Sequence, residues 1–220
     1  MANYDTDGNG VLMKSEAEAV TSIPLGLFNN RTDIFSFDEF ELFSNVTELI
    51  GSFNNGAFFG TSLKSMKLPK SITKLGNDAF MNSSDLKMEI DLPNLTTIGF
   101  GVFHGTGITK IKNLGKLTAI GNAGSSGSHF FAGNCPNLAY VELPSTLTSI
   151  GTNAFTNCPA LTEIVCHATT PPTLASNSFA GTTTNIGTIR VPAESVNAYK
   201  TATNWNTFAD IIKPLSEYTE

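Results

Sequence analysis

Residues 143–158, LPSTLTSIGTNAFTNC, carry a phrase that returns with variations along most of this chain. Its clearest landmark is a recurring phenylalanine, found at Phe58, Phe80, Phe103, Phe131, Phe155 and Phe179. These positions are 22, 23, 28, 24 and 24 residues apart. A period of this length is typical of a solenoid, in which each coil buries its apolar side against its neighbours.

Each coil contains a strand and a turn. Val141, Glu142 and Leu143 alternate with the two-residue period of a half-buried strand, and Pro144 ends it because proline has no N–H to donate. Only Gly or Asn stands two residues after each landmark: Gly60, Asn82, Gly105, Gly133, Asn157 and Gly181. These residue types enter the left-handed region at little cost, so we expect a positive-φ turn in every coil. The predicted fold class is an α/β-type repeat solenoid.

The composition is that of a folded domain. The 220 residues are 40% hydrophobic, and no stretch approaches the roughly 18 apolar residues that span a membrane. The first residues do not resemble a signal peptide, so an export leader is expected to be absent from this sequence. Residues 1–50 hold nine acids and two bases (−7), and residues 51–220 hold ten acids and eleven bases (+1). The nearly neutral repeats argue against a nucleic-acid partner, which needs a concentrated basic face.

Three cysteines form neither a CxxC pair nor an even disulfide set. Cys135 and Cys158 occupy the same place in matching phrases, so both should point inward in consecutive coils. We interpret them as buried thiols, with a disulfide between adjacent coils as the alternative.

The sequence offers little for catalysis. His104, His129 and His167 are scattered, and no metalloprotease or nucleophile motif is present. Cys166 and His167 do not make a dyad, because adjacent residues of a strand point to opposite faces. We expect no enzymatic activity.

The outward positions of the strands form a second pattern. One residue from each coil should lie beside the next on one exposed sheet: Lys67, Asp91, Lys112, Glu142, Glu163 or Val165, and Arg190. Their charges mostly alternate, and opposite charges on neighbouring strands each contribute about 0.2–1 kcal/mol. Two interpretations stay open, namely a self-compensated solvated sheet and a polar recognition surface with Tyr140 as its aromatic contact.

One coil is longer than the rest, because Gly121 lies ten residues before Phe131 whereas Gly151 lies four before Phe155. The six additional residues fall in the Gly/Ser-rich segment 122–129. Insertions in solenoids often lie on a binding face, although an idle surface loop is the alternative. The candidate ligand surface therefore consists of Lys67, Asp91, Lys112, Tyr140, Glu142 and His129.

Residues 5–16, DTDGNGVLMKSE, match the twelve-residue calcium loop at every diagnostic place. The predicted ligands are Asp5, Asp7, Asn9, Val11 through its carbonyl, and Glu16. Carboxylates held this close repel one another, and a divalent cation removes that repulsion. The loop resembles half of an EF-hand and also a single dockerin segment. Because only one copy is present, we predict a structural Ca²⁺, with a degenerate, empty loop as the alternative.

The phrases of residues 143–151 and 153–158 resemble the BspA-like leucine-rich repeats of bacterial surface proteins. The resemblance covers residues 45–185, and residues 191–200, VPAESVNAYK, resemble the usual ending of the family. It implies a right-handed leucine-rich repeat coil with parallel β-strands and short helical or irregular segments. Such proteins are typically exported by anaerobic gut and oral bacteria, and some are implicated in binding host matrix proteins or other bacteria. The resemblance thus implies an extracellular or outer-cell-surface location and a binding role.

Three regions follow from these patterns. Residues 1–44 hold the calcium loop and a helical N-terminal cap, residues 45–185 hold about six coils, and residues 186–220 form a C-terminal cap with a terminal helix. Caps are needed because the open end of a solenoid is apolar. Phenylalanines alternating with acids suit the N-terminal lid: Phe35, Phe37, Phe40 and Phe43.

We predict a non-catalytic secreted or cell-surface binding protein of the adhesion type. It would be a monomer that contacts protein or glycan, on a host or a neighbouring bacterial surface, through its exposed sheet and loops. The competing hypothesis is a structural spacer or envelope-assembly component without a ligand of its own.

Overall fold

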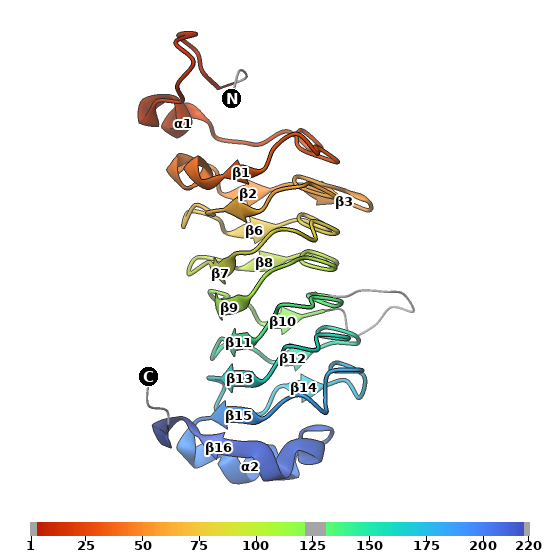
Figure 1. Ribbon diagram of the computed structural model, residues 1–220. Helices are drawn as coiled ribbons and strands as arrows, with labels where there is room; N and C mark the ends of the chain where they lie inside the picture. Colours follow the sequence, from red (N-terminus) through yellow and green to blue (C-terminus); the bar gives the residue numbers. More distant parts are fainter. Residues whose placement is uncertain (1–3, 122–130, 218–220) are drawn as a thin grey trace.

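The computed structural model describes residues 4–121 and 131–217. The chain winds into a parallel β-solenoid of about seven turns, whose coils stack from the N-terminal to the C-terminal end (Figure 1). Helix α1 (Lys14–Ala19) lies at one end of the stack and helix α2 (Val196–Thr201) at the other. The predicted solenoid fold is confirmed, with about one coil more than expected.

Two walls run along the stack. The larger is a parallel six-stranded sheet with strands β7 (Glu89–Asp91), β9 (Lys110–Asn113), β11 (Tyr140–Leu143), β13 (Glu163–Cys166), β15 (Thr188–Val191) and β16 (Ile212–Pro214). On its N-terminal side, β1 (Ser36–Phe37) pairs with β5 (Ser65–Met66). The second wall is built of short parallel strands: β2 (Glu48–Leu49), β6 (Lys74–Leu75) and β8 (Thr97–Ile98), then β10 (Ala119–Ile120), β12 (Ser149–Ile150) and β14 (Thr173–Leu174). An antiparallel hairpin, β3 (Gly51–Ser52) and β4 (Asn55–Gly56), projects from an early coil.

The strand pattern follows from alternating side chains. Val141 and Leu143 in β11 are fully buried, whereas Tyr140 and Glu142, which alternate with them, are partly exposed. The same inward position in neighbouring strands is held by Ile111 and Ile164, which pair with Val141 across the sheet. One hydrophobic core therefore runs through the whole stack, from the first coil to the C-terminal cap.

The landmark phenylalanines form a column. All six are buried, and the ring centroids of consecutive members lie 5.4 to 5.7 Å apart. The column continues past both ends of the predicted series, because Phe28 stacks on Phe58 at 4.9 Å and Phe208 contacts Phe179 at 5.9 Å. Ile23 also pairs with Leu49 of β2. The repeating ladder thus includes residues that the sequence analysis assigned to the N-terminal cap.

Phe131 breaks the register of the column. In most coils the landmark N–H donates to the residue before the next landmark, as Phe155 does to Ser178. Phe103 instead donates to Phe131 itself, and Ala132 donates to Ala154, so Ala132 occupies the landmark place in the backbone. The Phe131 ring meets its neighbours at 81° and 85°, whereas the other consecutive pairs stack within 11°. Measured to Ala132, the long coil carries seven additional residues (eleven minus four) rather than six.

The positive-φ turn is present in five of the six predicted places: Gly60, Asn82, Gly105, Asn157 and Gly181 have φ between 52° and 71°. The expectation for Gly133 is wrong, since the left-handed residue of that coil is Asn134, with φ 54°. The cause is the same one-residue shift that moves Ala132 into the landmark place.

Both ends of the core are covered. At the N-terminal end, η1 (Asp38–Leu42) follows β1, and Phe37, Phe40 and Phe43 are buried while Glu39 and Glu41 are exposed. Phe35 departs from the predicted lid because it is 55% exposed. At the C-terminal end, η2 (Ala193–Ser195), α2 and η3 (Trp205–Ile211) bury Tyr199 and Trp205, and η4 (Leu215–Glu217) follows β16.

The cysteine prediction is confirmed, because all three cysteines are free, buried thiols. Cys135 and Cys158 each donate an S–H bond of 3.0 Å to a backbone carbonyl of the preceding coil. Within the described ranges, none of the helices has the length and apolar character needed to cross a bilayer.

Candidate functional site

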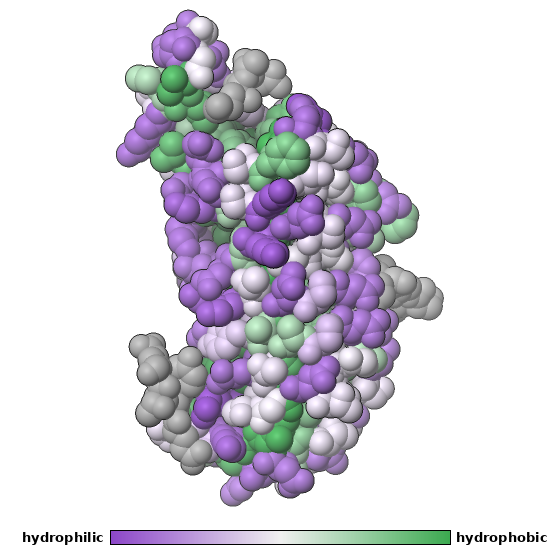
Figure 2. Space-filling model, viewed as in Figure 1, coloured by the Kyte–Doolittle hydropathy of each residue, from purple (hydrophilic) through white to green (hydrophobic). Residues whose placement is uncertain are grey.

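The outer face of the six-stranded sheet gathers polar side chains over β9, β11 and β13. Register places Tyr140 beside Lys110 and Glu142 beside Val165. Figure 2 shows hydrophilic residues together with paler and a few hydrophobic ones on the flank of the stack where these strands lie. The inward residues of the same strands are packed in the core, so a ligand of this sheet can contact only its outer face.

Glu89 and Glu142 each interact with two neighbouring side chains. Glu89 lies 2.5 Å from Lys112 Nζ and 3.5 Å from Lys110 Nζ. Glu142 accepts a hydrogen bond of 3.2 Å from the Tyr140 hydroxyl, and its other oxygen lies 2.6 Å from His167 Nε2. The contact with Lys112 lowers the pKa of Glu89, and the same contact raises the pKa of Lys112. Both groups therefore stay charged at neutral pH.

With the exception of Glu89, these side chains line a hollow of about 600 Å³, together with Val165 and Leu215. Glu89 joins them through its ion pairs with the two lysines. Val165 points outward on β13 but is only 4% exposed, and Leu215 of the C-terminal segment lines the same hollow. A second hollow of about 450 Å³ adjoins it and shares Lys112, Glu142 and His167. We call this arrangement the β9–β13 cluster: Glu89, Lys110, Lys112, Tyr140, Glu142 and His167.

Three of the predicted ligand-surface residues, Lys112, Tyr140 and Glu142, come together in this cluster. Lys67 and Asp91 line a separate hollow of about 450 Å³ toward the N-terminal end. There Lys67 pairs with Glu41 at 3.2 Å, and Asp91 pairs with Lys70.

The predicted ligand surface also includes Asp91, whose register differs from the expected one, and His129. A register shift after Ile90 sets Asp91 opposite Asn113, so Asp91 does not stand in line with Lys112 as expected. His129 lies outside the described residues, as does the rest of the segment 122–129.

Sequence reasoning missed Lys110, Glu89 and His167. Lys110 and Glu89 stand two residues before the outward positions chosen for their strands, and a period of two puts them on the same face. His167 follows Cys166, whose side chain is buried in the core, so the histidine turns outward as adjacent strand residues must. The signal was therefore present in the alternation itself.

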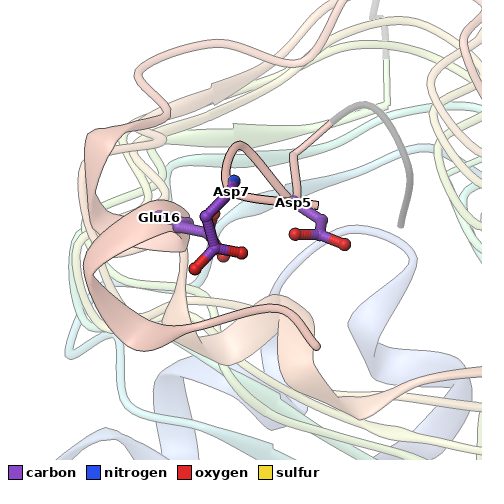
Figure 3. A group of neighbouring side chains, drawn as sticks. All are labelled: Asp5, Asp7 and Glu16. Atoms are coloured by element: carbon purple, nitrogen blue, oxygen red, sulfur yellow. The ribbon is translucent and has the colours of Figure 1, made fainter. Parts of the chain in front are cut away.

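The N-terminal loop forms a second candidate site, a metal centre. One carboxylate oxygen from each of Asp5, Asp7 and Glu16 lies within 4.8 Å of the others (Figure 3). Asp5 accepts backbone hydrogen bonds from Gly8, Asn9 and Gly10 at 2.8 to 3.2 Å, which folds the loop around its carboxylate.

The remaining predicted ligands, Asn9 and Val11, stand next to this group. The Asn9 amide donates to Asp7 at 2.8 Å and accepts the Val11 N–H at 2.8 Å. Glu16 accepts bonds from the Thr6 hydroxyl at 2.7 Å and from the Met13 N–H at 2.9 Å, which lower its pKa to about 2. A cluster of ionised carboxylates is a hard oxygen donor set of the kind that Ca²⁺ takes, so these residues fit the ion.

The Cys166 thiol is not a reactive group. It is fully buried, 3.2 Å from the Tyr199 hydroxyl, and burial raises the pKa of both side chains. A thiol must ionise and be reached by substrate to act as a nucleophile. Its position instead suits a packing role beneath the C-terminal cap.

Comparison with known proteins bears on the fold. The family model described as the BspA type leucine rich repeat region matches residues 15–128 and 124–212, in six copies. A solved structure of a leucine rich cell surface protein from Faecalibacterium prausnitzii A2-165 is similar, with 19% sequence identity and a TM-score of 0.28. That match covers 81% of this chain and 62% of the other, so this chain spans less than two thirds of that protein. No curated protein matches the sequence.

Proposed function

Because the chain belongs to the BspA-type leucine-rich repeat family, we propose that it is a non-catalytic recognition protein of the outer cell surface. In this proposal it acts as a monomer outside the cell and contacts a protein or a glycan through the outer face of its six-stranded sheet. The family model matches most of the chain, and it describes a repeat region rather than a catalytic domain.

One observation carries the proposal: polar side chains of the β9–β13 cluster line two adjoining hollows on the outer face of the sheet. A surface serving only as a spacer needs no such concentration of donors and acceptors. Here Lys110, Lys112, Tyr140, Glu142 and His167, from three strands or their ends, line two adjoining hollows, and Glu89 pairs with both lysines. Sites that recognise ligands are concave and hold a few convergent polar groups.

The test is saturable binding of the intact chain to two arrays, one of extracellular-matrix proteins and one of oligosaccharides. The proposal expects a binding curve on at least one array, lost when Lys112, Tyr140 and Glu142 are replaced together by Ala. The matched control replaces Lys74 and Glu48 by Ala, which breaks an ion pair of the second wall. Absence of saturable binding on both arrays would instead favour the spacer hypothesis.

We also propose that the N-terminal loop binds Ca²⁺ as a structural ion. The proposal rests on the grouping of Asp5, Asp7 and Glu16 and on the following helix α1, which carries Glu16. Leu12 and Ala17, on either side of Glu16, are buried in the core, so the ion would hold the loop and α1 against the first coil.

Isothermal titration of the intact chain with Ca²⁺ tests this second proposal. Heat with one-site stoichiometry is expected from the wild type, and a much weaker response from Asp5→Ala. Asp7→Asn removes one charge while keeping an oxygen that can accept the Asn9 N–H, so it weakens binding without opening the turn. Asp33→Ala, an exposed acid outside the loop, is the control. No heat from the wild type would end the proposal.

A further inference from the structure

We propose that the hollow of the β9–β13 cluster takes a neutral, hydroxyl-rich saccharide; this rests on the proposed recognition function and names the ligand class of that site. The hollow of about 600 Å³ is of the size that encloses a small ligand rather than a flat protein surface. Its chemistry narrows the class further.

Donors and acceptors are interleaved around the hollow. Lys110 and Lys112 offer ammonium protons, while Glu142 offers carboxylate oxygens that each already hold one partner. An ionised carboxylate has about four lone-pair sites, so Glu142 keeps capacity for further donors. A hydroxyl both donates and accepts, and a chain of hydroxyls is the ligand that satisfies such a mixed set.

The charge balance selects a neutral ligand. The charges of Lys110 and Lys112 are offset by those of Glu89 and Glu142, so the lysines and carboxylates of the cluster sum to zero. An acidic sugar would meet Glu142 and would compete with Glu89 for Lys112, which lies 2.5 Å away. A cationic ligand would meet the two lysines. Neither sign of charge finds an uncompensated partner here.

The floor of the hollow suits the apolar face of a sugar ring. Val165 lies beside Glu142 on the next strand, and Leu215 lines the same hollow from the C-terminal segment. With the Tyr140 ring they supply a small apolar area among polar groups. A protein partner would prefer the reverse, since charged residues are depleted at the centre of protein interfaces.

The test uses saturation-transfer difference NMR on the full chain with maltotriose, cellotriose and mannotriose as neutral probes and trigalacturonate as the acidic probe. Saturable transfer to at least one neutral trisaccharide is expected, and none to trigalacturonate. Tyr140→Phe keeps the ring and removes only the hydroxyl, and Glu142→Gln keeps the shape and removes the charge. Each is expected to weaken binding about tenfold, the effect of one hydrogen bond to a charged or hydroxyl group.

Glu41→Gln is the matched control, because Glu41 forms an exposed ion pair with Lys67 outside the hollow, and it is expected to leave binding unchanged. Binding of the acidic probe alone, or neutral binding insensitive to both cluster variants, would overturn the inference. Absence of binding to every neutral trisaccharide also overturns the saccharide inference. The array of matrix proteins then tests whether the recognition function itself still holds. Saturable protein binding would leave the recognition function standing without the saccharide.

Discussion

Neighbouring coils approach closely at Gly76, the glycine that follows Leu75 of the second wall. At Gly76 an added β-carbon would stand 2.3 Å from the backbone nitrogen of Gly51 and 2.9 Å from its α-carbon, both in the preceding coil. The Gly76 N–H also donates to Leu49 at 2.7 Å, which fixes how closely the two coils lie. Gly76→Ala therefore forces two backbones apart.

The expected change in the free energy of unfolding of Gly76→Ala follows from two opposing effects. Overpacking of this kind costs about 1–3 kcal/mol. Replacing Gly by Ala also restricts the unfolded chain, which stabilises the fold by about 0.4–1 kcal/mol. Gly187 isolates the second effect, because a β-carbon there would be 3.6 Å from the nearest atom, Thr162 O, and its φ is not in the left-handed region. Gly187→Ala is thus neutral or slightly stabilising, while Gly76→Ala loses stability on balance.

Urea denaturation of both variants and the wild type, followed by far-UV circular dichroism, measures the difference. With a urea m-value of about 1–3 kcal/mol per M, a gap of 1 kcal/mol in stability corresponds to a difference of about 0.3–1 M in the urea midpoint. Far-UV detection is preferred because Trp205 fluorescence reports the C-terminal cap alone. If Gly76→Ala unfolded at the same urea concentration as Gly187→Ala, the argument from coil spacing would be refuted.

Three further outcomes are expected. Phe155→Ala removes a fully buried ring from the column and should lower the free energy of unfolding by about 3–5 kcal/mol. Phe53→Ala, at a position that is 75% exposed, should leave the urea midpoint unchanged within error. Equal effects of the two substitutions would contradict the stabilising role of the column. Because the pKa of Glu16 falls from 4.5 to about 2 on folding, its contribution to stability is present above pH 4.5 and is lost as the pH falls toward 2. The protection factors of the Thr6 and Asp7 amides, which compare exchange with the intrinsic rate at each pH, should fall over that interval in the wild type and stay constant in Glu16→Gln. The three cysteine thiols should react with a disulfide reagent such as DTNB only after denaturation, and prompt native labelling would show that the coils open.

Much of the fold could be predicted because each coil repeats the same pattern of apolar, Gly and Asn residues. Phe155 and Asn157 are read correctly from the spacing alone, since the ring must enter the core and the turn must take a positive φ. Counting from Phe131 predicts the wrong turn residue, Gly133, for a physical reason. An aromatic ring reaches far enough to join the column from a neighbouring backbone position. Counting backward from Cys135, which matches Cys158, would have given Asn134 as the turn residue.

The candidate site was harder to predict than the coils. Period-two alternation is enough to select an outward face, and Tyr140 and Glu142 were found in this way. The shift that displaces Asp91 lies within β7 and β9 and has no marker in either strand considered alone. Val165 is only 4% exposed and lines the same hollow as Leu215, which lies 50 residues later in the sequence, and such long-range neighbours leave no trace in a local pattern.

The long coil rejoins its neighbour on both sides of its additional residues. Before them, Ile120 accepts the Gly151 N–H at 2.7 Å, and after them Ala132 donates to Ala154 at 2.9 Å. The coils on either side are thus fastened independently of whatever length of chain joins Gly121 to Ala132. The chain between Gly121 and Ala132 is therefore a suitable insertion site. An epitope or enzyme inserted there would be displayed by the solenoid without disturbing the hydrogen bonds between its coils.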